Sequence, residues 1–93
     1  MSKDDILTIL KNDLQISVSN YDAYLKNIII LAEKAIAKEG INLDDSTEDG
    51  MLVEMYAAYL YRKRREESAE MPRSLRYMLN NRLISQKAGN ADG

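Results

Sequence analysis

Residues 21–40 read YDAYLKNIIILAEKAIAKEG and decide the fold. Apolar side chains recur there every three or four positions, which is the spacing that places them on one side of a helix. The residues from Ser19 to Asp22 match an S-x-x-D variant of the capping box, and Gly40 suits the left-handed position after a helix end. The stretch therefore predicts a helix over residues 20–39. Its expected apolar stripe comprises Tyr21, Leu25, Ile28, Ala32 and Ala35, flanked by Tyr24, Ile29, Leu31 and Ile36.

Three more segments show helical periodicity, and no segment alternates as a strand does. The expected helices span residues 4–14, 47–67 and 72–87, with Pro72 in the first turn of the last one. The fold class is therefore all-α. We expect one small four-helix domain over residues 1–87, followed by a short flexible C-terminal tail over residues 88–93.

The composition restricts the chemistry available to the chain. Its 93 residues include no cysteine and no histidine, which excludes disulfides, Cys/His zinc sites and catalytic pairs that need a thiol or an imidazole. The acidic run from Asp44 to Asp49 lacks the alternate-residue ligand spacing of an EF-hand calcium loop. We expect no enzyme activity, no cofactor and no metal site. Because no signal peptide or membrane span is evident, synthesis in the cytoplasm is expected, without a membrane partner.

Charge is distributed unevenly along the chain. Residues 1–61 carry five lysines against eleven acids, whereas residues 62–93 carry eight Lys/Arg against four acids. The four consecutive cations from Arg62 to Arg65 fall at 100° intervals around a helix, so they predict a collar at the helix end, where cations suit the dipole. The acidic first part and the basic last part of the chain favour head-to-tail contact between copies as readily as binding to an anion.

An alternative function for the basic part is DNA binding. The third and fourth helices could form a helix-turn-helix whose last helix offers Arg73, Arg76, Asn80 and Asn81 to DNA.

Some apolar residues fall on the polar side of their helices. Ala23, Ile30 and Ala37 recur every seven residues opposite the main stripe, where two small side chains would let another helix approach the isoleucine. Helices that bury two faces need a partner for the second one. The predicted subunit interface comprises Ala23, Ile30, Ala37, Ala58, Tyr61, Tyr77 and Ile84.

Arg82 is a charged residue on the apolar side of its helix. A guanidinium at such a position should need a carboxylate or exposed carbonyls as its partner.

Four segments together resemble the small head-tail connector proteins of tailed bacteriophages, also called head-completion or adaptor proteins. These segments are DDILTILKNDLQIS, YDAYLKNIIILAEKAIAKEGINL, DGMLVEMYAAYLYRKR and MPRSLRYMLNNRL, which cover nearly the whole chain. The most specific pieces are YDAYL, EGI, the Tyr-Arg-x-Arg end of the third helix and Met-Pro leading to LNNRL. The family pattern falls on Arg62, Arg64, Pro72 and Arg82.

This resemblance implies an all-helical structural subunit without catalysis. Such subunits assemble as a ring, twelve-fold by resemblance, beneath the portal protein at the virion head-tail junction. The ring would extend the DNA channel, let DNA pass without sequence-specific binding, and provide the docking surface for the next connector or tail protein. The alternative interpretation is a small helical DNA-binding regulator that uses the third and fourth helices.

Overall fold

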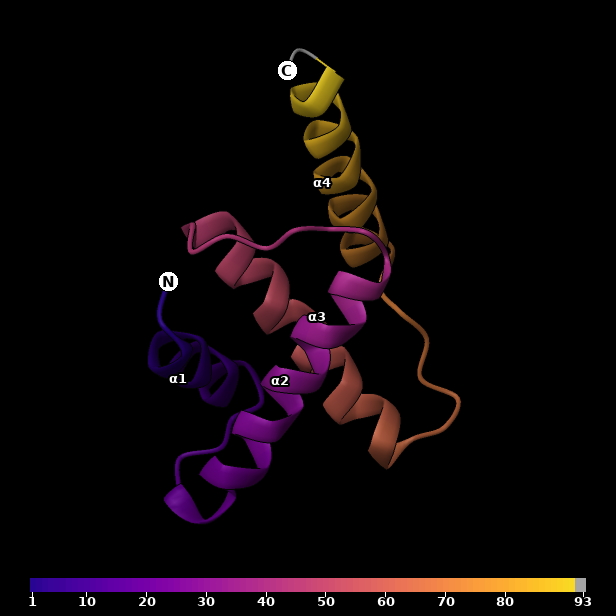
Figure 1. The fold of residues 1–93 in the computed structure, drawn as a ribbon. Coiled ribbons are helices and arrows are strands. Elements are labelled where there is room, and N and C mark those ends of the chain that lie inside the picture. Colours follow the sequence, from indigo (N-terminus) through magenta and orange to yellow (C-terminus); the bar gives the residue numbers. More distant parts are fainter. Residues whose placement is uncertain (92–93) are drawn as a thin grey trace.

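The computed structural model describes residues 1–91, which form four α-helices (Figure 1). These are α1 (Lys3–Asp13), α2 (Asp22–Lys38), α3 (Thr47–Arg65) and α4 (Arg73–Ala91), with a 3₁₀ turn, η1 (Ser19–Tyr21), before α2. No strand occurs among the described residues, so the predicted all-α fold is confirmed. The last helix extends four residues beyond its expected end at 87. Of the expected tail, residues 88–91 continue α4, and residues 92–93 lie outside the described part.

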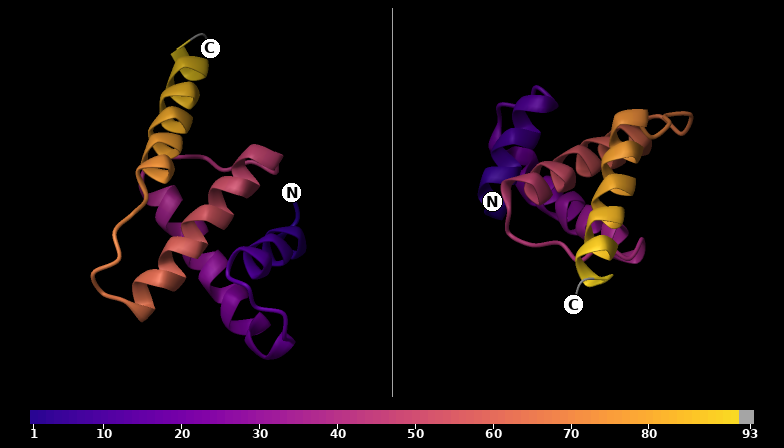
Figure 2. Two further views of the ribbon diagram at one scale, coloured as in Figure 1. Left: turned by 180° about the vertical axis from the view of Figure 1, so that it is seen from behind. Right: turned by 90° about the horizontal axis from the view of Figure 1, so that it is seen from above.

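The central element is α3, which contacts each of the other three helices. It crosses α2 near the middle of the molecule, and α1 lies beside this crossing (Figure 1). In contrast, α4 projects away from the other helices (Figure 2). The result is an elongated molecule with extents of 46 × 30 × 18 Å.

The apolar faces of all four helices contribute to one core. The helix α2 supplies a continuous buried stripe, α3 supplies residues on more than one side, and α4 inserts two leucines. The completely or almost completely buried side chains include Leu10, Leu25, Ile28, Ile29, Ala32, Ile36, Ala57, Leu75 and Leu79. Burying a leucine or isoleucine stabilises a fold by roughly 1.5–3 kcal/mol, so this cluster is the main source of stability.

Three residues expected in the apolar stripe of α2 or at its flank are instead exposed. The exposed fractions are 48% for Tyr21, 39% for Tyr24 and 47% for Leu31. Met78 on α4 is also exposed, with 36% of its surface open. Since α4 projects outward, it covers little of α2 and buries little of its own surface. The packed face is therefore narrower than the periodicity predicts.

The helix ends differ from the sequence expectation at one informative place. The predicted capping box of Ser19 and Asp22 does not form: Tyr21 occupies the N-cap position of α2 without a side-chain cap, and Lys11 Nζ donates to Asp22 Oδ1 at 2.7 Å. Side-chain caps occur instead on α1, from Ser2, and on α3, from Ser46. The C-terminal prediction for α2 is confirmed by Gly40, whose φ of 93° is a left-handed conformation that favours glycine.

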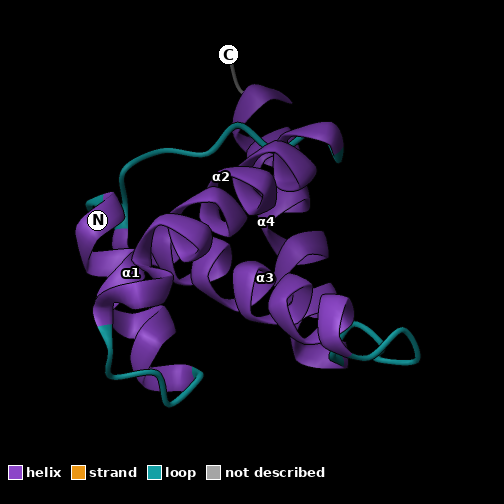
Figure 3. Ribbon diagram, turned by 90° about the horizontal axis from the view of Figure 1, so that it is seen from below, coloured by secondary structure: helices purple, strands orange, loops and turns teal. Residues whose placement is uncertain are grey.

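The connection from α3 to α4 is a seven-residue segment, 66–72, that loops away from the helices (Figure 3). Lys63 Nζ donates to the carbonyl of Ala69 at 3.1 Å and so holds part of this loop against the end of α3. Pro72 lies immediately before α4, and its carbonyl accepts from the amide of Arg76 at 3.2 Å. Pro72 therefore helps to start α4, close to its expected position.

Candidate functional site

The α2 seam, defined as Ala23, Ile30 and Ala37, lies on the outer face of α2. All three residues are exposed, and Ile30 leaves 37% of its surface open. A hollow of about 230 Å³ borders Ile30 between α1 and α2, with Lys3, Asp4, Lys26 and Ile29 as its other lining residues. The seam is thus an accessible apolar ridge beside a depression.

A second exposed apolar surface lies on α4. Tyr77 is 67% exposed and Ile84 is 64% exposed, and their side chains are seven residues apart on one helix. Tyr77 also borders a hollow of about 290 Å³ with Arg73, Arg76 and Asn80. The predicted outward position of both apolar residues therefore agrees with their exposure.

The prediction that Ala58 lies on an outer surface of α3 is wrong. Ala58 is only 2% exposed and belongs to the core, so it cannot contribute to a subunit surface in this conformation. Tyr61 is half-buried and packs edge-on against Tyr24, with the ring centroids 6.5 Å apart. The physical reason is the central position of α3, because helices on several sides leave it little outward surface.

The Tyr–Arg hollow, defined as Tyr21, Tyr24, Arg64 and Arg65, joins the start of α2 to the end of α3. Its volume is about 470 Å³. The Arg64 guanidinium lies over the Tyr24 ring at 5.8 Å, and that of Arg65 lies over the Tyr61 ring at 4.5 Å. Both distances suit cation–π attraction. Arg64 and Arg65 follow each other on α3, 100° apart, yet both side chains line this hollow.

The Arg82 cluster connects α4 to the start of α3. Arg82 Nε donates to Asp49 Oδ1 at 2.8 Å, and Arg82 Nη2 donates to Asp49 Oδ2 at 3.0 Å and to the carbonyl of Asn42 at 2.7 Å. Asp49 is 2% exposed, and its hydrogen bonds raise the pKa of the Arg82 guanidinium above the usual value. Gln86 extends the cluster by donating to the carbonyl of Gly40 at 2.8 Å and accepting from the amide of Asn42 at 2.7 Å. The carboxylate that Arg82 requires is therefore Asp49.

Sequence reasoning did not identify Asp49 as this partner. The residue appears in the sequence as one of several acids at the start of α3, where a carboxylate suits the helix dipole. Its carboxylate also accepts from the amide of Asp44 at 2.8 Å, so one side chain organises both the loop and the ion pair. Nothing in local spacing separates this buried acid from its exposed neighbours.

Glu54 is a buried carboxyl group in the middle of α3. It is 2% exposed, and its Oε2 has no hydrogen-bond partner in the described part of the chain. Burial and, after it, the nearby carboxyl group of Asp13 raise the pKa of Glu54 to about 8, and the positive charge of Arg62 opposes this shift. Glu54 is therefore protonated at neutral pH in the folded chain.

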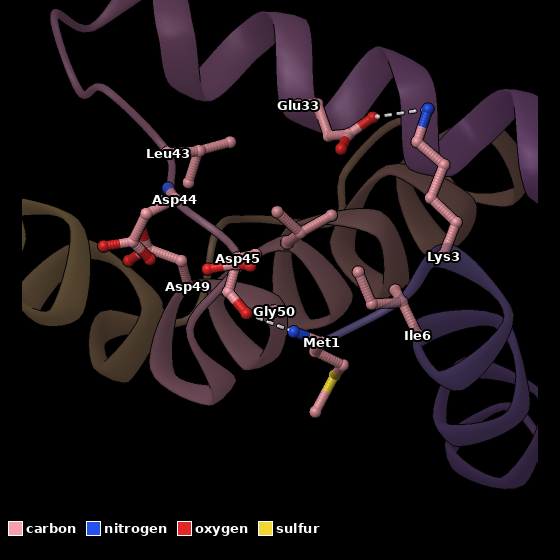
Figure 4. A pocket seen from close by; sticks show the side chains of 10 residues that line it. Met1, Lys3, Ile6, Glu33, Leu43, Asp44, Asp45, Asp49 and Gly50 are labelled. Carbon is pink, nitrogen blue, oxygen red and sulfur yellow. Dashed lines mark hydrogen bonds and ion pairs between the residues drawn. The ribbon is translucent and has the colours of Figure 1, made fainter.

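A hollow of about 300 Å³, with both apolar and charged lining residues, lies near the N-terminus, between α1 and the start of α3 (Figure 4). Lys3 pairs there with Glu33 at 3.6 Å, whereas the Asp44 and Asp49 carboxylates lie on the opposite side of the hollow, and the terminal amine donates to the carbonyl of Asp45. Within the described residues, no three His, Cys, Asp or Glu side chains are grouped to hold a metal ion. Three of the acids at this hollow have partners: Glu33 pairs with Lys3, Asp44 accepts from the amide of Ser46, and Asp49 pairs with Arg82.

No protein-family model, curated protein or solved structure matches the chain. No described helix combines the length and apolar character needed to cross a bilayer.

Proposed function

We propose that this protein is a structural head-tail connector of a tailed bacteriophage. In this proposal, copies assemble as a ring beneath the portal protein, extend the DNA channel and offer a docking surface to the next connector or tail protein. The observation that carries the proposal is the presence of exposed apolar side chains on two separate elements: Ile30 and Leu31 on α2, and Tyr77 and Ile84 on α4. A subunit in a closed ring needs two such faces, one for each neighbour.

The proposed contact places the α2 seam of one copy against α4 of the next. Ala23 and Ala37 leave room for a helix to approach Ile30, and Tyr77 and Ile84 supply apolar surface on an element that projects from the molecule. Different surfaces meet in this arrangement, so it is a heterologous contact. Such contacts close into rings when the rotation between copies permits it.

The DNA-binding alternative receives less support from the geometry. Arg76, one of the cations assigned to the reading helix, donates to both carboxylate oxygens of Glu39, at 2.8 and 3.2 Å. The seven-residue link between α3 and α4 is also longer than the usual three- to four-residue helix-turn-helix turn. A phosphate contact by Arg76 would have to replace an existing bidentate ion pair.

The test combines the mass of the purified protein, measured by light scattering over a concentration series, with negative-stain microscopy. We expect closed rings for the wild-type protein, alone or after addition of portal-bearing heads. Ile30→Lys should stay helical but lose the rings, because it places a charge in an apolar contact. Asn12→Lys is the control, since it adds the same charge to an exposed position of α1, outside the α2 seam.

Two results would contradict the proposal. Normal rings from Ile30→Lys would show that the α2 seam is misassigned. Absence of rings both alone and on portal-bearing heads, together with tight, salt-sensitive binding to duplex DNA, would favour the regulator instead.

A further inference from the structure

The two ends of α3 carry opposite and exposed charges. Asp45 and Glu48 lie at its start, and Arg64 and Arg65 lie at its end. An α-helix rises 1.5 Å per residue, so about 27 Å separates the first and last residues of α3. The two groups cannot meet within one chain, and none of these four side chains forms an ion pair in the described part of the molecule.

Helix-dipole stabilisation alone explains why acids precede α3 and cations end it. It does not explain the shape of the basic end. There, Tyr21 at the end of η1 and Tyr24 in the first turn of α2 lie beside Arg64 and Arg65, and the four side chains line the open Tyr–Arg hollow. The cation–π contacts restrain both guanidiniums at the wall of one depression. Restraint of this kind lowers the entropy cost of binding an anion.

We propose that the Tyr–Arg hollow binds the acidic start of α3, Asp45 and Glu48, from a second copy of this chain. Each copy then presents a basic hollow at one end of α3 and two acidic side chains at the other. The contact is heterologous and head-to-tail, and it uses surfaces distinct from the α2 seam. It rests on the proposed function because the occupant is another subunit of the same assembly.

The geometry favours carboxylates over nucleic acid as the occupant. Proteins that bind single strands stack bases on open aromatic faces, but guanidiniums cover the Tyr24 and Tyr61 rings here. The acids Glu66 and Glu67 follow directly on the cations and would repel a long phosphate track. Two carboxylates can pair with the two guanidiniums at one place. They do not have to continue past Glu66 and Glu67, as a strand of phosphates would.

Charge reversal tests the contact in the intact protein. The variants are R64E/R65E and D45K/E48K, with K87E and E70K as controls that reverse exposed charges elsewhere. Sedimentation equilibrium up to about 1 mM protein covers the range of weak self-association. Each double variant should self-associate at least about tenfold more weakly than the wild type, since like charges then face each other. An equimolar mixture of the two should regain association, because every contact in an alternating assembly again pairs opposite charges.

The outcomes separate this contact from the proposed function. Rings that persist in both reversals would overturn the contact and leave the connector proposal intact. A wild-type chain that remains monomeric at about 1 mM would overturn the contact whatever happens on portal-bearing heads. Circular dichroism verifies the fold of each variant, and R64Q/R65Q, which adds no repulsion, replaces the reversal if the latter unfolds. Failure of the mixture to recover would also contradict the proposal.

Discussion

At the scale of single residues, Glu54 couples folding to pH. Its pKa is about 8 in the folded chain, above the ordinary value of 4.5. Between these two values the folded state binds a proton that the unfolded state has released, so the free energy of unfolding decreases as pH rises. The slope from one such group is at most about 1.4 kcal/mol per pH unit. The stability that proton binding by Glu54 contributes is fully present below pH 4.5 and is lost as pH rises through 8.

Glu54→Gln should therefore increase stability at pH 8.5 and change it little at pH 4.5, because the amide cannot ionise. Urea unfolding at several pH values measures the difference. Glu67→Gln is the matched control, since that carboxyl group is exposed in the connection after α3. An equal response of both variants to pH would show that burial of Glu54 does not control this titration.

At the scale of elements, α4 depends on a polar anchor because it contributes few residues to the core. Leu75 and Leu79 are its buried side chains, and the ion pair of Arg82 with Asp49 fixes the following turn against the start of α3. Arg82→Ala would leave the Asp49 carboxylate buried without its cation. Loss of one partner from a buried pair costs about 3 kcal/mol, so we expect a decrease of that size in the free energy of unfolding.

Hydrogen exchange distinguishes local from global effects of this substitution. We expect the amides of α4 to lose more protection than those of α2, because α4 would detach first. Arg73→Ala is the control, since Arg73 is an exposed α4 residue with no ion pair in the described part of the chain. A uniform loss of protection across all helices would contradict a specific anchoring role.

Sequence periodicity predicts the four helices, but it predicts their ends only in part. Four apolar repeats predict four helices, and Gly40 correctly predicts one C-terminus. The predicted cap at Ser19 fails because Lys11, from another helix, attracts the Asp22 side chain. Local spacing contains no information about that partner. The same limit applies to Arg82: its place on an apolar stripe predicts an acidic partner, but local spacing does not single out Asp49.

At the scale of the whole molecule, helix crossing creates surfaces that no single segment contains. Periodicity predicts the α2 seam and the outward position of Tyr77, because each depends on one helix only. The Tyr–Arg hollow needs the start of α2 beside the end of α3, and burial of Ala58 needs α3 at the centre. Both features depend on packing angles between helices, which side-chain spacing leaves open.

The two proposed contacts between copies should respond differently to salt. The contact at the Tyr–Arg hollow joins exposed charges, and screening lengths decrease from roughly 14 Å at about 50 mM salt to roughly 4 Å at about 500 mM. The contact at the α2 seam is apolar and should persist or strengthen in salt. We therefore expect wild-type association to weaken severalfold over this range, as measured by sedimentation equilibrium. R64Q/R65Q should associate more weakly at low salt and lose most of the salt response, whereas K87Q should keep it. If R64Q/R65Q retained the full response, the salt-sensitive charges would lie outside the hollow, and the apolar seam would remain the only contact proposed between copies.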